Sequence, residues 1–216
     1  MLKASLQLKE FLSPRTLLIT HGTFADAEST LRFLLSGEIS YLGNKYKITP
    51  HGWGLIVIFQ NYLKNIELDW DTTGIQEVLG LEIQGKFDYR DKVISKLPSF
   101  QQSIVNSVLS GHGTAEVMAL CQRMIQNEVA TLHDLSPRYW CHEIQQKVFI
   151  FHGANDSMVP FTEAILLAES IPDSELLISY LYEHKELTMN KGMYFKLKEL
   201  LRMAHFFSKF YFYNEN

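Results

Sequence analysis

The sequence predicts an α/β fold, in which a small parallel sheet is interrupted by a helical insertion. Three short apolar runs, at residues 16–20, 147–151 and 176–181, are rich in residues that favour strands. Helical periodicity separates these runs, and strands that alternate with helices typically form a parallel sheet. Residues 67–135 carry only helical patterns. These three observations together predict the fold class.

The chain of 216 residues is long enough for one domain with a substantial core. The helical stretch interrupts the predicted strands, as a cap or lid over the edge of a sheet would. We therefore assign residues 1–66 and 136–216 to an α/β core, and residues 67–135 to a helical cap insertion.

The first predicted element is an amphipathic helix at residues 1–12, which Ser13-Pro14 breaks. Residues 16–20 (TLLIT) form a short apolar run that predicts a buried strand, closed by His21-Gly22. A helical pattern follows at residues 25–35, and Ser36-Gly37 gives it a C-cap signal.

Residues 37–50 are polar and rich in turn residues, so we expect a loop there. Residues 51–66 are compatible with a strand or a helix, and we favour a helix because the apolar run continues through Leu63. Gly and Pro divide the insertion itself into four predicted helices, at residues 72–84, 86–97, 99–109 and 114–132.

The C-terminal third returns to alternating strands and helices. Residues 147–151 predict a strand, 162–169 a helix and 176–181 a second strand. The final helix is expected at residues 191–211, with an apolar side formed by Tyr194, Leu197, Leu200, Leu201 and Phe207. We expect the aromatic tail, residues 206–216, to pack on the sheet; the alternatives are a partner surface or a site for an acyl ligand.

The composition is that of an ordinary globular protein, with 46% apolar and 20% charged residues. A net charge of −4 and a pI near 6.1 do not favour nucleic acid or an anionic membrane as a partner. No apolar window is long enough to predict a membrane span, and residues 1–15 do not resemble a signal peptide, so we expect a cytoplasmic protein. We expect Cys121 and Cys141 to be thiols and not a disulfide. No metal or cofactor is expected.

The most informative motif begins at the predicted strand 147–151. His152-Gly153 ends that strand, Asp156 follows in a turn, and Val159-Pro160 precedes a helix. His184 follows the next strand, 28 positions after Asp156. A carboxylate at the carboxyl end of a parallel strand can hold the imidazole of a neighbouring loop in one tautomer and stabilise its charged form. The alternative is that Asp156 only caps its turn and that His184 is a surface residue.

Residues 147–184 resemble the α/β-hydrolase superfamily, in particular its esterase, dienelactone-hydrolase and prolyl-oligopeptidase-like branches. Members of that superfamily end the acid-bearing strand with the pattern hG-x-x-D-x-x-VP. The resemblance implies a partial α/β-hydrolase fold, with Asp156 as the acid and His184 as the base of a Ser-His-Asp triad. It also implies a small acyl or ester substrate.

The nucleophile of that family is missing, because the chain contains no G-x-S-x-G turn. Ser110-Gly111-His112-Gly113 has the glycines but no preceding strand. An ancestral ester hydrolase that lacks its nucleophile in this chain is therefore one interpretation. A non-catalytic, truncated or decayed hydrolase that acts as a binding protein or has no function is the alternative.

Two placements of the N-terminal region fit the resemblance. In the first, residues 20–24 (THGTF) are the oxyanion loop, with His21 and Gly22 as weak oxyanion or pocket residues. In the second, which we prefer, residues 1–12 are the end of the helix that normally follows the nucleophile, and the strand at 16–20 is the next strand of the sheet. The chain would then contain about three parallel strands with one exposed edge, through which we expect self-association.

Overall fold

The computed structural model describes residues 2–8, 10–12, 16–183, 186–187 and 192–215. Its contacts divide the chain into two compact units. The first unit comprises residues 1–33, 37–49 and 132–216, and the second comprises residues 34–36 and 50–131.

The first unit contains a three-stranded sheet among the described residues. Its strands are β1 (Leu18–His21), β4 (Val148–Gly153) and β5 (Ser174–Ser179), in the order β1-β4-β5. Both pairs are parallel, and Val148 pairs with Leu18 on one side and with Ser174 on the other. The predicted parallel α/β arrangement is therefore confirmed.

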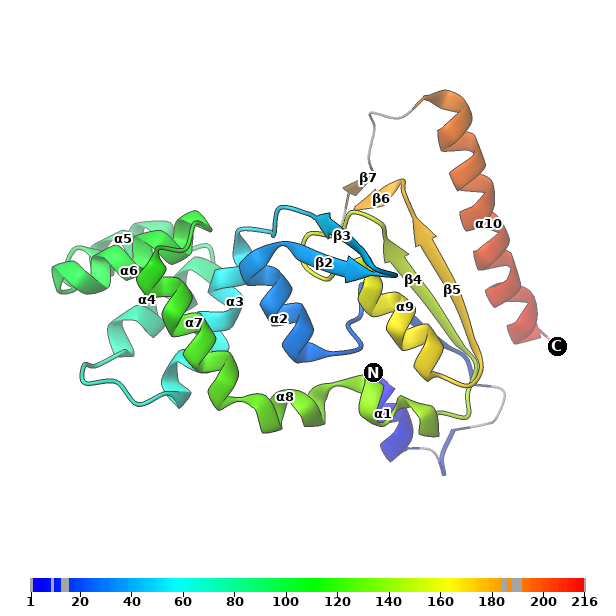
Figure 1. Ribbon diagram of the computed structural model, residues 1–216, viewed down its shortest axis with the longest axis horizontal. Coiled ribbons are helices and arrows are strands. Elements are labelled where there is room, and N and C mark those ends of the chain that lie inside the picture. The colour runs from blue at the N-terminus through cyan, green and yellow to red at the C-terminus, as the bar shows by residue number, and fades with distance from the viewer. Residues whose placement is uncertain (1, 9, 13–15, 184–185, 188–191, 216) are drawn as a thin grey trace. The chain divides into compact units, whose positions relative to one another are not determined.

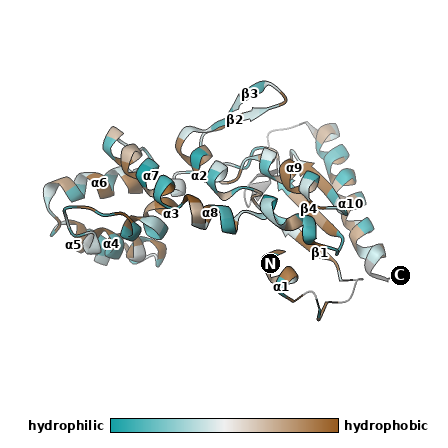
Figure 2. Cartoon of the chain, turned by 60° about the horizontal axis from the view of Figure 1, so that its bottom comes forward, coloured by the Kyte–Doolittle hydropathy of each residue, from teal (hydrophilic) through white to brown (hydrophobic). Residues whose placement is uncertain are grey.

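Helices cover both faces of this sheet, as a parallel sheet requires. α1 (Leu2–Gln7) and α9 (Phe161–Ser170) pack on one face, and α10 (Met193–Glu215) packs on the other. Figure 1 shows α9 in yellow and α10 in red on opposite sides of the strands. All six residues of β4 are buried, because its side chains alternate between the two faces. Figure 2 shows β4 as mainly hydrophobic, and its first four residues are Val, Phe, Ile and Phe.

α2 (Ala27–Ser36) follows β1 and ends as its sequence predicts, with Gly37 in the left-handed conformation at a φ of 68°. The next segment is not the predicted loop, since it forms the hairpin of β2 (Glu38–Tyr41) and β3 (Asn44–Lys47). Leu42 and Gly43 both have positive φ in its turn. The rings of Tyr41 and Tyr46 in this hairpin pack against that of Phe161 in α9. The polar composition of residues 37–50 gives no sign of this contact.

All regular elements among the described residues of the second unit are helices, and the predicted helix within 51–66 is confirmed as α3. The predicted helix at 114–132 is interrupted at Glu128, whose side chain accepts a hydrogen bond from Asn65 Nδ2 (2.8 Å). The second unit includes residues 50–66, which precede the predicted insertion, because α3 packs against the helices of the insertion. That this unit acts as a cap stays a prediction. Its elements are α3 (Trp53–Tyr62), η1 (Leu63–Asn65), α4 (Thr73–Ile83), α5 (Phe87–Ile94), α6 (Ser99–Ser110), α7 (Ala115–Asn127) and the start of α8 (Val129–Leu135).

Short elements complete the first unit: η2 (Pro137–Tyr139), η3 (Cys141–Glu143), β6 (Tyr182–Glu183) and β7 (Glu186–Leu187). β6 and β7 pair antiparallel. Within the described part of the chain, no helix combines the length and apolar character that crossing a bilayer requires.

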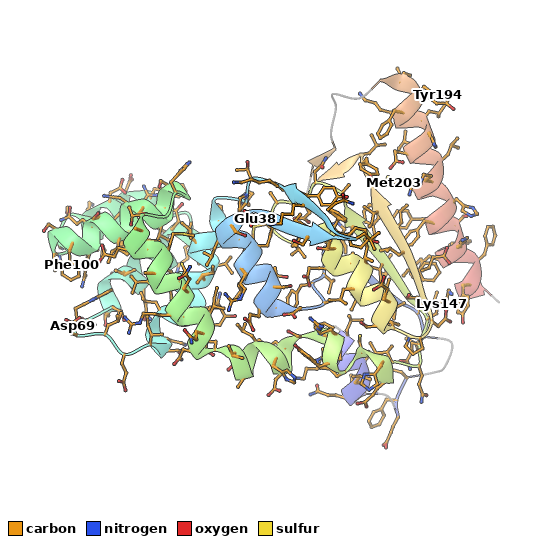
Figure 3. The ribbon with its side chains drawn as sticks, viewed as in Figure 1. Glu38, Asp69, Phe100, Lys147, Tyr194 and Met203 are labelled. Atoms are coloured by element: carbon orange, nitrogen blue, oxygen red, sulfur yellow. The ribbon has the colours of Figure 1, made fainter. Side chains whose placement is uncertain are left out.

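The predicted apolar side of the last helix is wrong. The side of α10 that faces the sheet carries Glu199, Met203, Phe206 and Phe210, whereas the residues assigned to its apolar side are exposed. Figure 3 labels Met203 on the side of the helix that faces β5. The rings of Phe206 and Phe210 meet that of Phe149 edge to face, which selects this side of the helix.

Candidate functional site

Two loops meet at the carboxyl edge of the sheet. Gly22, directly after β1, donates its N–H to the carbonyl of Phe151 in β4 (3.2 Å). Its φ of +58° is a left-handed conformation that glycine adopts without strain. A side-chain carbon at this position would lie 3.7 Å from Oδ2 of Asp156, so the backbone of the first loop lies beside the carboxylate of the second.

The carboxylate of Asp156 is buried, with 1% of the residue exposed. Its Oδ1 accepts the backbone N–H groups of Met158 (2.7 Å) and Val159 (3.0 Å), which shapes the turn that leads into α9. Its Oδ2 is directed toward Gly22 and lies 4.0 Å from Nε2 of His152. One oxygen therefore fixes the loop, while the other faces the end of β1.

His152 is a second buried polar residue in this region, and sequence reasoning did not assign it to the site. Its Nε2 lies 2.9 Å from the carbonyl oxygen of Val159, which can only accept, so Nε2 carries the proton. The 4.0 Å separation from Asp156 Oδ2 is beyond hydrogen-bond range. The hydrogen bond of His152 therefore holds the Asp156 turn against β4. Because its Nε2 is used in this way, His152 is not the base that Asp156 would orient. Its position in a fully buried strand was the signal available in the sequence.

The other predicted site residues have different surroundings. His184 lies outside the described residues; β6, which directly precedes it, lies against β4. His21 is exposed, and its ring stacks on that of Phe151 with centroids 5.3 Å apart. The structure thus brings Gly22 and Asp156 together, whereas the ring of His21 contacts the Phe151 side of the sheet.

A buried carboxylate on α9 joins the two loops of the site. Oε2 of Glu163 accepts the backbone N–H groups of Ala25 (3.0 Å) and Asp26 (2.7 Å), and Oε1 accepts the hydroxyl of Ser29. Asp26 also forms an ion pair with Arg138 (2.7 Å). Burial raises the pKa of the Glu163 carboxyl, and the hydrogen bonds from Ser29, Asp26 and Ala25 oppose that rise. Glu163 thereby ties the segment after β1 to the helix that follows the Asp156 turn.

A pocket of about 330 Å³ lies beside this network, between α2, the β2–β3 hairpin and α9. Ser29, Arg138 and Glu163 contribute polar groups to its wall, and Pro160 extends the wall toward the Asp156 turn. Glu38, labelled in Figure 3, is part of its lining. The pocket has the size for a small molecule, and its wall combines these polar groups with apolar side chains such as Phe33 and Leu166.

Ser179 carries a hydroxyl at this edge of the sheet, where it pairs with Gly153 across β4 and β5. Ser179, at the end of β5, is buried; its hydroxyl lies 3.6 Å from Sδ of Met203 and accepts the N–H of Leu181 (3.2 Å). These contacts give Ser179 a structural role. Within the described ranges there is also no group of three or more His, Cys, Asp or Glu side chains that could hold a metal ion.

Comparisons with models of protein families, with curated proteins and with solved structures find no match. The motif in residues 147–184 and the geometry at the carboxyl edge of the sheet are therefore the observations that bear on function.

Proposed function

We propose that this chain carries the acid and base of an α/β-hydrolase-type site that hydrolyses an ester or a similar acyl bond. Asp156 is the acid and His184 the base. The observation that carries the proposal is the buried carboxylate of Asp156, whose Oδ1 is fixed by two backbone N–H groups while its Oδ2 faces the end of β1. Such a carboxylate is rigid and poorly solvated, and it can orient an imidazole strongly.

In this proposal, His184 takes the proton from an attacking hydroxyl and returns it to the leaving group, and Asp156 stabilises the imidazolium between these steps. The reaction passes through an acyl-enzyme. The chain has no Ser in a G-x-S-x-G turn, so the attacking Ser would come from outside these 216 residues.

The order of the strands supports this assignment. Asp156 follows the middle strand, β4, and the segment that contains His184 follows the neighbouring strand, β5. Loops after adjacent parallel strands meet at the same edge of a sheet, which is where α/β proteins bind their ligands. A strand that carried the nucleophile would be expected to pair with the other side of β1.

The alternative function is that of a non-catalytic protein derived from a hydrolase. The missing G-x-S-x-G turn favours it. In such a protein, Asp156 would have a structural role: it accepts hydrogen bonds from the N–H groups of Met158 and Val159, and these bonds stabilise the turn before α9.

The test is hydrolysis of 4-nitrophenyl acetate and labelling by a fluorophosphonate, with the protein purified from its own cells. Asp156→Asn and His184→Gln are compared with the native chain and with His205→Gln, which removes an exposed imidazole. If the proposal is right, the first two substitutions lower the rate about 10³-fold or more, and the control does not.

Asp156→Asn keeps an oxygen that can accept the two backbone bonds, so urea unfolding should show a folded variant. Equal rates in all four proteins would refute the assignment of Asp156 and His184. No turnover and no labelling in the native protein would refute the enzyme and favour the non-catalytic alternative.

A further inference from the structure

α10 has a second side on which large apolar residues are exposed. One side of the helix packs on the sheet through Met203, Phe206 and Phe210. We call the opposite side the outer face of α10. Its large apolar residues are each at least 38% exposed: Tyr194, Leu197, Leu200, Leu201, Phe207 and Tyr211. Phe207 lies at the border of this face, because its ring also contacts that of Phe151 in β4. Exposed apolar patches of this extent mark surfaces that meet a partner or a membrane.

These residues form one continuous strip along the helix. Leu197 and Leu201 are one turn apart, and Leu200, Phe207 and Tyr211 follow the same side at helical spacing. The helix of 23 residues is about 35 Å long, given a rise of about 1.5 Å per residue. Tyr194, labelled in Figure 3, lies in its first turn.

Positive charge is concentrated beside this strip. α10 contains four Lys or Arg residues and two Glu residues, a net charge of +2, whereas the whole chain has −4. Lys198, Arg202 and Lys209 fall along one flank of the outer face at helical spacing. Glu199 is only 3% exposed, where it pairs with Arg202 and accepts the N–H of Tyr180. The composition of the whole chain hides this local concentration of charge.

A groove of about 670 Å³ continues the apolar surface at the C-terminal half of the helix. Phe149, Phe212 and Tyr213 supply its apolar lining, and the charged residues of the lining are Lys147, Lys209 and Glu175. The Nζ of Lys147 lies 5.7 Å from the ring centroids of both Phe149 and Tyr213. Lys147, labelled in Figure 3, also pairs with Asp173, and Lys209 pairs with Glu175.

We infer that the outer face of α10 binds the surface of an anionic phospholipid bilayer, with the helix lying in the plane of the interface. A strip of Leu, Phe and Tyr flanked by Lys and Arg is the pattern of interfacial helices. Tyr and Phe place apolar rings at the headgroup boundary, and the cations meet lipid phosphates and carboxylates. The sheet-facing side is occupied by the core, so the helix lies on the bilayer and does not enter it.

Charge distinguishes this occupant from a second copy of the chain. Antiparallel pairing of two outer faces would bring the flank of one copy that carries Lys198 and Arg202 beside the cationic flank of the other copy, which opposes association. An anionic bilayer instead gains about fivefold in affinity for each basic residue near its surface. Binding should therefore require anionic lipid and weaken as ionic strength rises.

The experiment is flotation of the full chain with vesicles of phosphatidylcholine alone and of phosphatidylcholine mixed with phosphatidylserine. Leu197→Gln/Leu201→Gln removes two exposed leucines from the outer face. The matched control, Ile83→Gln/Phe87→Gln, removes two similarly exposed apolar residues from the second unit. Lys198→Gln removes an exposed flanking charge. Light scattering gives the oligomeric state, and circular dichroism verifies folding.

The native chain should float with phosphatidylserine vesicles and not with phosphatidylcholine alone. The leucine double variant should lose about tenfold or more of this binding, because each buried leucine contributes strongly to partition. Lys198→Gln should lose about fivefold, and the control pair should bind as the native chain does.

Absence of native binding to either vesicle would overturn the inference. Equal binding to both vesicles, or equal loss in the control pair, would overturn it too. A dimer that the leucine variant dissolves, without vesicle binding, would identify a second copy as the occupant instead.

Discussion

Replacement of Glu163 tests whether its buried carboxylate holds the candidate site together. Glu163→Ala removes the acceptor of two backbone N–H groups, those of Ala25 and Asp26, and of the Ser29 hydroxyl. Ala25 and Asp26 are themselves buried. A buried donor without a partner costs about 1–3 kcal/mol, so we expect the free energy of unfolding to fall by about 2–5 kcal/mol.

Glu163→Gln separates the loss of hydrogen bonds from the loss of charge. Both backbone N–H groups donate to the same oxygen, Oε2, and the single oxygen of a Gln side chain can accept both. Its amide N–H₂ then faces the hydroxyl oxygen of Ser29, which can accept. We expect this variant to lose less than about 1.5 kcal/mol at neutral pH, because the charge-assisted part of the bonds is offset by relief of charge burial.

The difference in stability between the native chain and Glu163→Gln should depend on pH. The pKa of Glu163 is raised in the folded chain above its ordinary value of 4.5, chiefly by burial. The folded state therefore holds the proton more tightly than the unfolded state does. This contribution to stability is fully present below the ordinary pKa and is lost as the pH rises through the raised pKa. Across that window, the native chain should lose stability relative to Glu163→Gln.

Urea unfolding of the three proteins at a series of pH values measures these differences. The reasoning about hydrogen bonds is refuted if Glu163→Ala loses less than about 0.5 kcal/mol, or if Glu163→Gln loses as much as Glu163→Ala. If the stability of the native chain does not fall relative to that of Glu163→Gln as the pH rises, the reasoning about burial is refuted.

The remaining predictions concern the second unit. Gly111→Ala should lower the free energy of unfolding by about 3 kcal/mol or more, because the new side-chain carbon would lie 2.5 Å from Cα of Gly52. Gly85 has a similar positive φ but open space around it, so Gly85→Ala should lose only about 1 kcal/mol. Thermal unfolding of both variants measures this difference. Burial raises the pKa of Cys121 to about 12, so iodoacetamide should leave it unmodified in the native chain at about pH 8 and modify it in urea. Peptide mass spectrometry reads the label, and rapid native modification would contradict the buried placement.

Part of the candidate site follows directly from the sequence. The order of strand, His152-Gly153, Asp156 and Val159-Pro160 predicts a carboxylate in a loop at the carboxyl end of a strand, and the structure has Asp156 in that loop. Parallel pairing then brings Gly22 beside it, as adjacent strand ends require. Local patterns suffice here because turn chemistry and strand direction are set by neighbouring residues.

The supporting residues could not be found in the same way. Glu163 bonds to Ala25 and Asp26 only after distant segments pack together, and His152 bonds to Val159 only once the Asp156 turn has folded back on β4. Sequence periodicity gives no signal for such contacts, since a buried polar residue looks like an exposed one until its partner is known.

Local patterns are enough to predict the class of the fold, the three strands and most helix limits, because apolar periodicity and caps such as Gly37 act within a few residues. Contacts between distant segments select the buried side of α10 and form the hairpin at residues 38–47. α10 is apolar on two sides, so its own pattern allows either to face the sheet. The rings of Phe149 and Phe161, distant in sequence, select the buried side of α10 and the position of the hairpin.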